Sequence, residues 1–215
     1  LDLLKKETFI NVPKDIDVAY YLVHSMSSAD NYTELEKKSA INFRDAIYIT
    51  EAKQVIYLSG IVNEKELSEH LNSRKIVEEE LDKGKYALTT LRAGIIIGAG
   101  SASFEIIRDL VEKLPFMITP KWLLTKCQPI GVSDVITFLS KSLLNERLFN
   151  KNYDIGGPDV LTYKEMLLGF AKNRKLKRKI VTVPIMTPKL SSYWLYFVTS
   201  TSYSLAKALV SSMKV

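Results

Sequence analysis

Short apolar runs alternate with helical patterns along the first part of the chain. Three runs rich in β-branched and aromatic residues are typical of buried strands: Asp17–Val23, Gln54–Leu58 and Tyr86–Leu91. Between them, helical patterns cover Tyr32–Glu51 and Glu66–Lys83. Strands that alternate with helices at this spacing favour a parallel sheet built from βαβ crossovers. We therefore expect an α/β fold with a doubly wound parallel sheet.

Two further stretches extend this pattern. Leu1–Leu4, at a chain start that is not a methionine, reads as the tail of a strand already under way. Later, an apolar strand from Thr90 leads into the small residues of Gly98–Ser103, and a helix follows to about Leu114. A final strand is expected at Ile180–Val183.

The loop Gly98–Ser103 could be a phosphate-binding turn, because small residues between a strand and a helix let the backbone approach a pyrophosphate. Two features count against this interpretation. Ser103 stands where the third glycine of the dinucleotide fingerprint is needed, and the acidic residue expected about 20 positions later is missing. A glycine-rich turn with another role is the stronger interpretation.

The composition is that of a globular protein. The chain has 215 residues, 47% of them hydrophobic, and its single cysteine excludes an internal disulfide and suits a reducing compartment. No apolar run is long enough to span a membrane. We therefore expect a cytoplasmic protein.

A basic run, Lys172–Lys179, contributes much of the net charge of +6. Its simplest interpretation is a solvated helix C-terminus, where positive charge complements the helix dipole. Contact with acidic lipid or nucleic acid is the alternative. No aromatic residues are interleaved with the run as a base-stacking surface requires, so we expect no nucleic-acid partner.

Small and polar residues follow the predicted strands. Ligands of parallel sheets bind beyond the carboxyl ends of the strands. This rule selects Asp2, His24, Ser25, Ser59, Gly60, Arg92, Ala93 and Gly94. The two histidines, His24 and His70, both fall at or near these ends. One cysteine and two distant histidines give no metal-ligand spacing, so no metal is expected.

Several motifs, in their order along the chain, resemble the extended short-chain dehydrogenase/reductase superfamily, in particular its NAD(P)H-binding, nucleotide-sugar-epimerase-like branch. They are Asp17–Ser25, Asn42–Ala46, Val55–Gly60, Leu91–Gly94, Pro129–Val135, Tyr153–Gly157 and Leu161–Glu165. The resemblance covers the chain to about Pro188 and implies a Rossmann-like fold that binds NAD or NADP.

The resemblance also implies that the chain is a fragment. In the family, a glycine-rich strand–turn–helix and a second strand precede the point where this sequence begins, and both strands lie between Leu1–Leu4 and Asp17–Val23. The phosphate loop would then be in the missing part. By position, Gly98–Ser103 would shape the substrate mouth, and Asp2 and Leu3 would lie at the adenine end of the cofactor.

The family's catalytic pair is not conserved in this chain. Members that do redox chemistry use a Tyr-x-x-x-Lys pair after the strand that ends here at Ser59, and that pair is absent. At the same i, i+4 spacing the chain offers His70 and Arg74, which could supply a proton and hold a ribose or phosphate. The alternative is an ordinary exposed pair at a helix start, with Ser68 as the N-cap. Ser59, His70 and Arg74 are thus the catalytic candidates, and His24, Ser25, Gly60, Arg92, Ala93 and Gly94 complete the cofactor site.

We expect two domains. Residues 1–150 form the remainder of the NAD(P)-binding domain, with 98–128 contributing to the substrate side, and 151–215 form a small C-terminal substrate or lid subdomain. The aromatic segment Lys189–Val198 and the helical pattern Leu205–Met213 pack as core of that subdomain, or serve as a lid over an apolar substrate or as a patch for a partner or membrane. Phe116 and Trp122 could line the same pocket.

Two functions remain open from the sequence. The first is an oxidoreductase or epimerase-like enzyme that transfers hydride between NAD(P)(H) and a small-molecule substrate. The second is a non-catalytic dinucleotide-binding protein, a redox sensor or an assembly subunit, that has lost the catalytic tyrosine. The sequence separates neither these two functions nor NAD from NADP, and it does not determine the oligomeric state.

Overall fold

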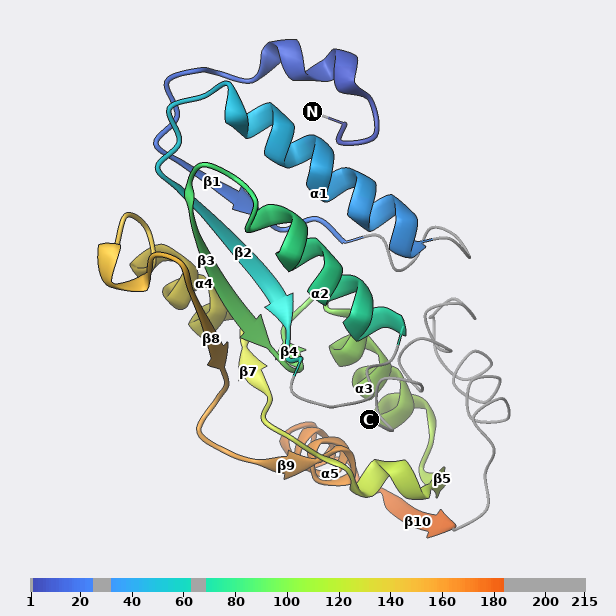
Figure 1. Cartoon of the computed structure of the whole chain (residues 1–215). Helices are drawn as coiled ribbons and strands as arrows, with labels where there is room; N and C mark the ends of the chain where they lie inside the picture. The colour runs from blue at the N-terminus through green and yellow to red at the C-terminus, as the bar shows by residue number, and fades with distance from the viewer. Residues whose placement is uncertain (1, 25–31, 63–68, 184–215) are drawn as a thin grey trace. The chain divides into compact units, whose positions relative to one another are not determined.

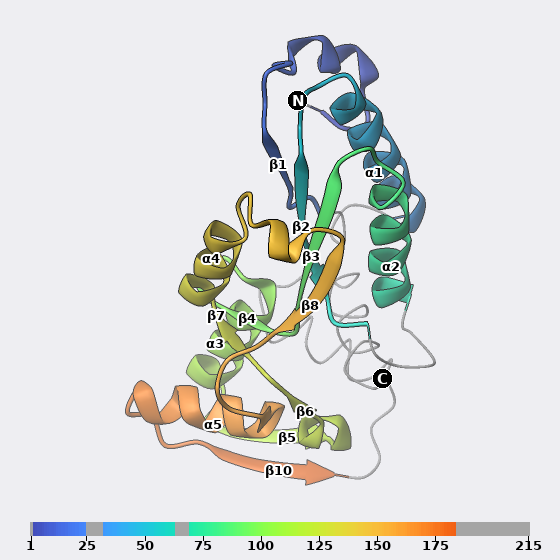
Figure 2. The same ribbon diagram turned by 60° about the vertical axis from the view of Figure 1, so that its left-hand side comes forward.

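The computed structural model describes residues 2–24, 32–62 and 69–183, without the side chains of residues 69 and 70. The chain divides into two compact units (Figures 1 and 2). One comprises residues 1–93 and 135–155, and the other comprises residues 94–134 and 156–215.

The first unit is built on a parallel sheet. Its strands are β1 (Val18–Tyr21), β2 (Gln54–Gly60), β3 (Ala87–Ala93) and β8 (Lys151–Ile155), and they lie side by side in that order. All three pairings are parallel. The predicted α/β fold with a parallel sheet is confirmed.

Helices cover both faces of this sheet, as Figure 2 shows. On one face lie α1 (Tyr32–Tyr48) and α2 (Glu69–Leu81). They pack Phe43, Val77 and Leu81 against Tyr21 and other strand side chains. On the other face lies α4 (Val132–Lys141), whose Leu139 carbonyl accepts a hydrogen bond from the Tyr20 hydroxyl. The doubly wound arrangement therefore follows from strands that are apolar on both faces.

The first residues do not form a strand. Leu3 and Leu4 lie in a turn, and a 3₁₀ helix, η1 (Lys6–Asn11), follows. The Asp2 carboxylate accepts the Leu4 backbone N–H at 2.9 Å, and Asn42 of α1 donates to the Leu3 carbonyl at 2.7 Å. A side chain that bonds its own backbone two residues on stabilises a turn at the expense of a strand. The predicted strand tail at Leu1–Leu4 is thus wrong for residues 2–4.

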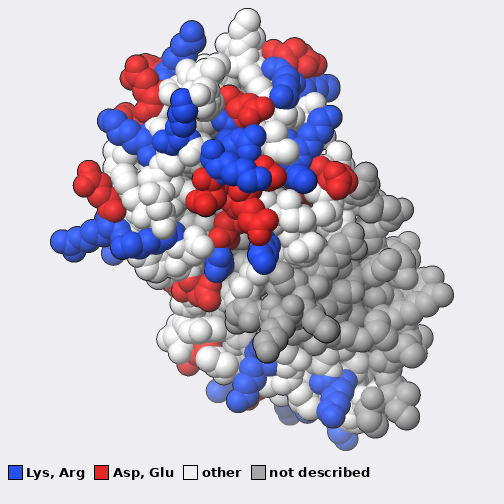
Figure 3. Space-filling view, viewed as in Figure 1, with Lys and Arg blue, Asp and Glu red and all other residues white. Residues whose placement is uncertain are grey.

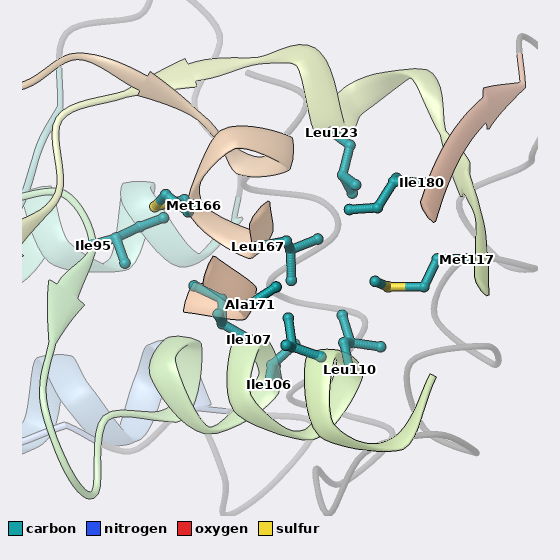
Figure 4. Close-up of a cluster of buried hydrophobic side chains, with 11 residues drawn as sticks. Ile95, Ile106, Ile107, Leu110, Met117, Leu123, Met166, Leu167, Ala171 and Ile180 are labelled. Atoms are coloured by element: carbon teal, nitrogen blue, oxygen red, sulfur yellow. The ribbon is translucent and has the colours of Figure 1, made fainter. Parts of the chain in front are cut away.

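The second unit surrounds its own hydrophobic core, shown in Figure 4. Its helices are α3 (Ala102–Lys113), α5 (Tyr163–Asn173) and the 3₁₀ helix η2 (Lys121–Leu124). A parallel pair, β5 (Phe116–Pro120) with β10 (Lys179–Val183), packs Met117 and Ile180 against Leu110 of α3 and Leu167 of α5. The predicted helix after Ser103 and the predicted strand at Ile180–Val183 are confirmed.

Short two-stranded ladders complete this unit. The strand β4 (Ile96–Ile97) pairs with β7 (Ile130–Gly131) in parallel, and β6 (Lys126–Cys127) pairs with β9 (Leu161–Thr162) in antiparallel. Thr162 and Glu165 form a capping box at the start of α5. The remaining 3₁₀ helix, η3 (Glu146–Leu148), belongs to the first unit.

Charges of both signs are mixed on the surface. On the face shown in Figure 3, Lys and Arg lie among Asp and Glu over α1 and α2. In the basic run that follows α5, Arg174 pairs with Glu112 at 3.1 Å, and the Arg178 guanidinium donates to backbone carbonyls of Val111 and Glu112. Part of this run is therefore tied to α3. No helix in the described part of the chain is both long and apolar enough to cross a bilayer.

Candidate functional site at the carboxyl edge of the sheet

The parallel register brings the predicted strand-end residues to one edge of the sheet. Ser59 pairs with Arg92, and Gly60 pairs with Ala93, at the ends of β2 and β3. On the other side of β2, Tyr21 pairs with Tyr57, so His24 follows the end of β1 at the same edge. Figure 1 shows the arrows of β1, β2 and β3 pointing the same way.

Ser59 presents a buried hydroxyl without a partner. Ser59 is 6% exposed, and among the described residues its Oγ has no partner at hydrogen-bond geometry, although it lies near enough to the Tyr57 hydroxyl to lower the pKa of that phenol. Because side chains alternate along a strand, Ser59 shares the α1/α2 face with Tyr57. A buried hydroxyl left unpaired costs roughly 1–3 kcal/mol. Thr90, deeper in the sheet, is also unpaired, so it is the position of Ser59 at the ligand-binding edge that singles it out.

The helix α2 passes close to the end of β2. A Cβ on Gly60 would lie 3.4 Å from Leu71 Cδ2 and 3.9 Å from Arg74 Cγ, so the helix lies at van der Waals distance from this strand end. Arg74 is 8% exposed, and its guanidinium donates to the Val23 carbonyl at 3.4 Å. Arg74 therefore fixes the segment that follows β1. Its own backbone carbonyl accepts the Tyr57 hydroxyl at 3.4 Å.

His24 is held by a buried carboxylate that the sequence analysis did not select. Its Nδ1 lies 2.8 Å from Glu36 Oε1, and the Ser73 hydroxyl donates to Glu36 Oε2. Glu36 belongs to α1 and is 2% exposed, whereas the His24 side chain is 34% exposed. Since a carboxylate accepts, Nδ1 is the protonated nitrogen. Helix α1, through Glu36, and helix α2, through Ser73, thus meet at the segment that follows β1 and carries His24.

Arg92 is engaged by a second carboxylate. Its Nε lies 3.1 Å and one terminal nitrogen 2.6 Å from the two oxygens of Glu78 on α2. Asn152 of β8 donates to the same carboxylate at 2.9 Å. The hydrogen-bonded Glu78 raises the pKa of the Arg92 guanidinium, although burial opposes this. Arg92 therefore stays charged and fixed in direction.

Burial raises the pKa of Tyr57. The nearby Arg74 guanidinium and the Ser59 hydroxyl act in the opposite sense, and Glu36 adds to the increase. Since Tyr57 is fully buried, its phenol is a structural group. The tyrosine that the catalytic pair would need is not supplied by this residue.

The remaining predicted site residues fall into three groups. Asp2 and Leu3 lie in the turn against α1, and there is no strand end at this position to carry them to the edge of the sheet. His70 lies one helical turn before Arg74 in α2, but its side chain and the whole of Ser25 lie outside the described residues, as do Ser68, Lys189–Val198 and Leu205–Met213. Gly94 opens the second unit.

The loop Gly98–Ser103 uses its own polar groups internally. Gly100, at a φ of 82°, donates its N–H to the Glu105 carboxylate at 3.2 Å, and the Ser101 N–H donates to the Gly98 carbonyl at 3.1 Å. A Cβ on Gly98 would lie 2.7 Å from Val132, so this glycine is required for packing. The Glu105 carboxylate takes the amide that a phosphate would need. The geometry therefore supports a structural turn over a pyrophosphate loop.

Two other aromatic candidates lie in the second unit. Phe116 is about half exposed on β5. Trp122 packs edge-on against Tyr163, with ring centroids 6.1 Å apart, and its indole N–H has no partner among the described residues. Their place in a substrate pocket stays a prediction.

One partner that the sequence did not predict as a site residue, Glu36, has a recognisable pattern around it in the sequence. Glu36 shares one helix face with Ala40, Phe43 and Ile47, which are all buried. A lone carboxylate on an apolar stripe requires a buried hydrogen-bond donor. What the sequence could not give was the donor's identity, because His24 and Ser73 belong to other elements.

Comparison with known proteins gives similarity at the level of the fold. No family model and no curated protein matches the chain. A nucleoside-diphosphate-sugar epimerase of Staphylococcus aureus superposes with a TM-score of 0.75 at 12% identity, over 100% of this chain and 72% of that one. The protein RMD of Pseudomonas aeruginosa, solved with NADPH, gives 0.69 at 14% identity, over 99% and 86%.

A third structure of similar fold belongs to a protein that is named as a different kind of enzyme. The triphenylmethane reductase of a Citrobacter species, solved with NADP(H), superposes with a TM-score of 0.74 at 13% identity, over 99% of this chain and 71% of that one. These likenesses show that the chain has the Rossmann-like fold expected from its motifs. At such low identities they show the fold alone.

Proposed function

We propose that the chain binds NAD(H) or NADP(H) at the carboxyl edge of the sheet β1–β2–β3–β8 and transfers hydride to or from a small-molecule substrate. The observation that carries this proposal is the buried Ser59 hydroxyl at that edge, for which the described residues offer no partner at hydrogen-bond geometry. A polar group kept there without a protein partner indicates a ligand that supplies one. The nicotinamide nucleotides named with structures of the same fold agree with this choice.

The residues at this edge fit the nicotinamide end of a dinucleotide. Gly60 and Ala93 pair at the ends of adjacent strands and so border the region beyond the carboxyl edge where ligands of parallel sheets bind. Arg92 contributes a fixed positive charge through its pair with Glu78. We also retain His24, Ser25 and Gly94 as proposed contacts on the strength of their positions in the sequence. The nucleotide would supply the hydride, and the Ser59 hydroxyl would orient the substrate oxygen by donating to it.

The environment of Arg74 favours the second function, that of a non-catalytic dinucleotide-binding protein. Arg74, which takes the position of the family's lysine, is buried and directed at the Val23 carbonyl. A guanidinium committed to the backbone acts as a structural tie. If His70 also has no part in proton transfer, the chain would be a dinucleotide-binding redox sensor or assembly subunit.

Titration with NADPH and NADH, followed by nicotinamide fluorescence, tests binding for both functions. Carbonyl and quinone acceptors are then screened for loss of nicotinamide absorbance. Turnover that falls at least about tenfold in Ser59→Ala, with nucleotide affinity kept, supports the enzyme. Tight binding with no turnover supports the sensor, and failure to bind either nucleotide rejects both functions.

A further inference from the structure

We propose that His24 is the group that exchanges a proton with the substrate, and that Glu36, held by Ser73, positions it. The inference rests on the proposed hydride transfer. In this proposal His24, which the sequence motifs assign only to the cofactor site, takes the proton-transfer role of the family's tyrosine, which this chain lacks. The carrying observation is a histidine–carboxylate pair whose carboxylate is buried and whose imidazole is partly exposed at the ligand-binding edge.

The geometry fixes the protonation pattern of the imidazole. Glu36 is 2% exposed, and a buried carboxylate is costly unless its oxygens accept hydrogen bonds. One oxygen lies 2.8 Å from His24 Nδ1, and the other accepts the Ser73 hydroxyl. Nδ1 therefore faces Glu36 as a donor, and Nε2, on the other side of the imidazole ring, is the nitrogen that we assign to proton exchange with the substrate. A carboxylate behind an imidazole has the same effect in hydrolytic triads.

The segment that carries His24 is held from two helices. Glu36 of α1 holds the imidazole, and Arg74 of α2 donates to the carbonyl of the preceding residue, Val23, at 3.4 Å. A catalytic acid or base needs such fixed placement, because small errors in position are expensive in rate. In the parallel register this segment leaves the sheet beside the end of β2, which carries Ser59.

The proton step balances with the proposed hydride transfer. In the reductive direction the reduced nucleotide would supply hydride to the substrate carbonyl carbon and be oxidised, and the π electron pair of the carbonyl would move to oxygen. The oxygen takes the Nε2 proton of the His24 imidazolium, which leaves an alcohol, the oxidised nucleotide and a neutral imidazole that retains Nδ1–H. Solvent returns the proton. In the oxidative direction Nε2 accepts it.

The first measurement needs no ligand. Long-range ¹H–¹⁵N correlation spectra report which imidazole nitrogen carries the proton, and the chain has two histidines. Replacing His70 with Gln leaves a single imidazole signal, that of His24. We expect Nδ1–H to dominate in this background and to lose its dominance in Glu36→Gln. Glu80→Gln, which removes a carboxylate paired with Arg44 and Lys83 instead, should leave the tautomer unchanged.

The second measurement uses His24→Asn. The asparagine amide can replace Nδ1–H toward Glu36, but it has no counterpart of Nε2. We expect kcat to fall by about 100-fold or more, the usual contribution of a general acid, while NADPH affinity stays within about threefold. Glu36→Gln should lower kcat by about tenfold through the misplaced tautomer.

Three results would overturn the proposal. The first is a tautomer that does not respond to Glu36→Gln, and the second is a His24→Asn variant with normal kcat. The third is a His24→Asn variant that loses NADPH affinity but keeps kcat, which leaves His24 as a cofactor contact only. Failure of the wild-type chain to bind NADPH or to turn over would instead reject the proposed function, and the proton-transfer role with it.

Discussion

The two ends of strand β2 treat a buried polar side chain in opposite ways. At the amino end, Gln54 is fully buried and every polar atom of its side chain is used. Its amide donates to the Thr89 hydroxyl and the Ser142 carbonyl, both at 2.9 Å, and its oxygen accepts the Leu144 N–H at 2.7 Å. At the carboxyl end, the Ser59 hydroxyl is also buried, and the described residues offer it no partner at hydrogen-bond geometry.

This difference separates structure from function on one strand. A satisfied buried network fixes a single arrangement of β2, β3 and the segment after α4, and it adds to stability. An unsatisfied group lowers stability, so its presence at the ligand-binding edge needs another reason. The same sheet thus uses its amino edge for cohesion and, in our proposal, its carboxyl edge for a ligand.

The largest effect is expected from Gln54→Leu. The leucine fills a similar volume but leaves the Leu144 N–H without its acceptor and removes one donor each from the Thr89 hydroxyl and the Ser142 carbonyl, which keeps the Asn145 N–H. We expect a loss of about 3 kcal/mol in the free energy of unfolding, measured by urea denaturation. Gln128→Ala is the control, because Gln128 is exposed and its side chain donates to the Gly157 carbonyl. Equal losses in the free energy of unfolding of both variants would show that the buried network around Gln54 does not contribute more to stability than one exposed hydrogen bond.

Much of the fold was predictable from the sequence because it depends on local pattern. The strands β2 and β3, the helix α3 and the capping box of α5 follow from periodicity and from cap residues that lie within a few positions of each other. The parallel pairing then set His24, Ser59 and Arg92 at one edge. Leu1–Leu4 was misread because its apolar residues resemble a strand, whereas the Asp2 carboxylate stabilises a turn.

The site was predictable only in part. Strand-end positions follow from the topology, but Glu36, Ser73 and Glu78 act through partners on other elements. His24 and Glu36 are 12 residues apart, and Ser73 and Glu36 are 37 apart. No local rule connects positions at such separations, and only the packing of α1 and α2 against the sheet brings them together.

A smaller effect is expected from Glu78→Ala at the carboxyl edge. The change leaves the half-buried Arg92 guanidinium without its carboxylate and Asn152 without its acceptor. We expect a loss of about 2 kcal/mol in the free energy of unfolding, since removing one partner of a shielded pair exposes the cost of the other charge.

The matched control for Glu78→Ala is Asp17→Ala. It breaks the Lys53–Asp17 pair, whose side chains are 68% and 61% exposed, and should cost no more than about 0.5 kcal/mol. If Glu78→Ala lowered the free energy of unfolding no more than this control in urea denaturation, the Arg92–Glu78 pair would not be shielded from solvent as the structure indicates.

The smallest change in stability is expected from Ser59→Ala, and it is the most informative. Because the hydroxyl has no partner to lose, its removal should leave the free energy of unfolding unchanged or raise it by up to about 1 kcal/mol. Thr89→Val is the matched deletion at the amino edge, where the hydroxyl accepts from Gln54 and donates to the Leu148 carbonyl, and it should cost about 1–2 kcal/mol. Urea denaturation of the two variants side by side measures the contrast directly. A Ser59→Ala loss as large as that of Thr89→Val would show that the chain itself satisfies this hydroxyl in solution, and the argument for a ligand at the carboxyl edge would then lose its foundation.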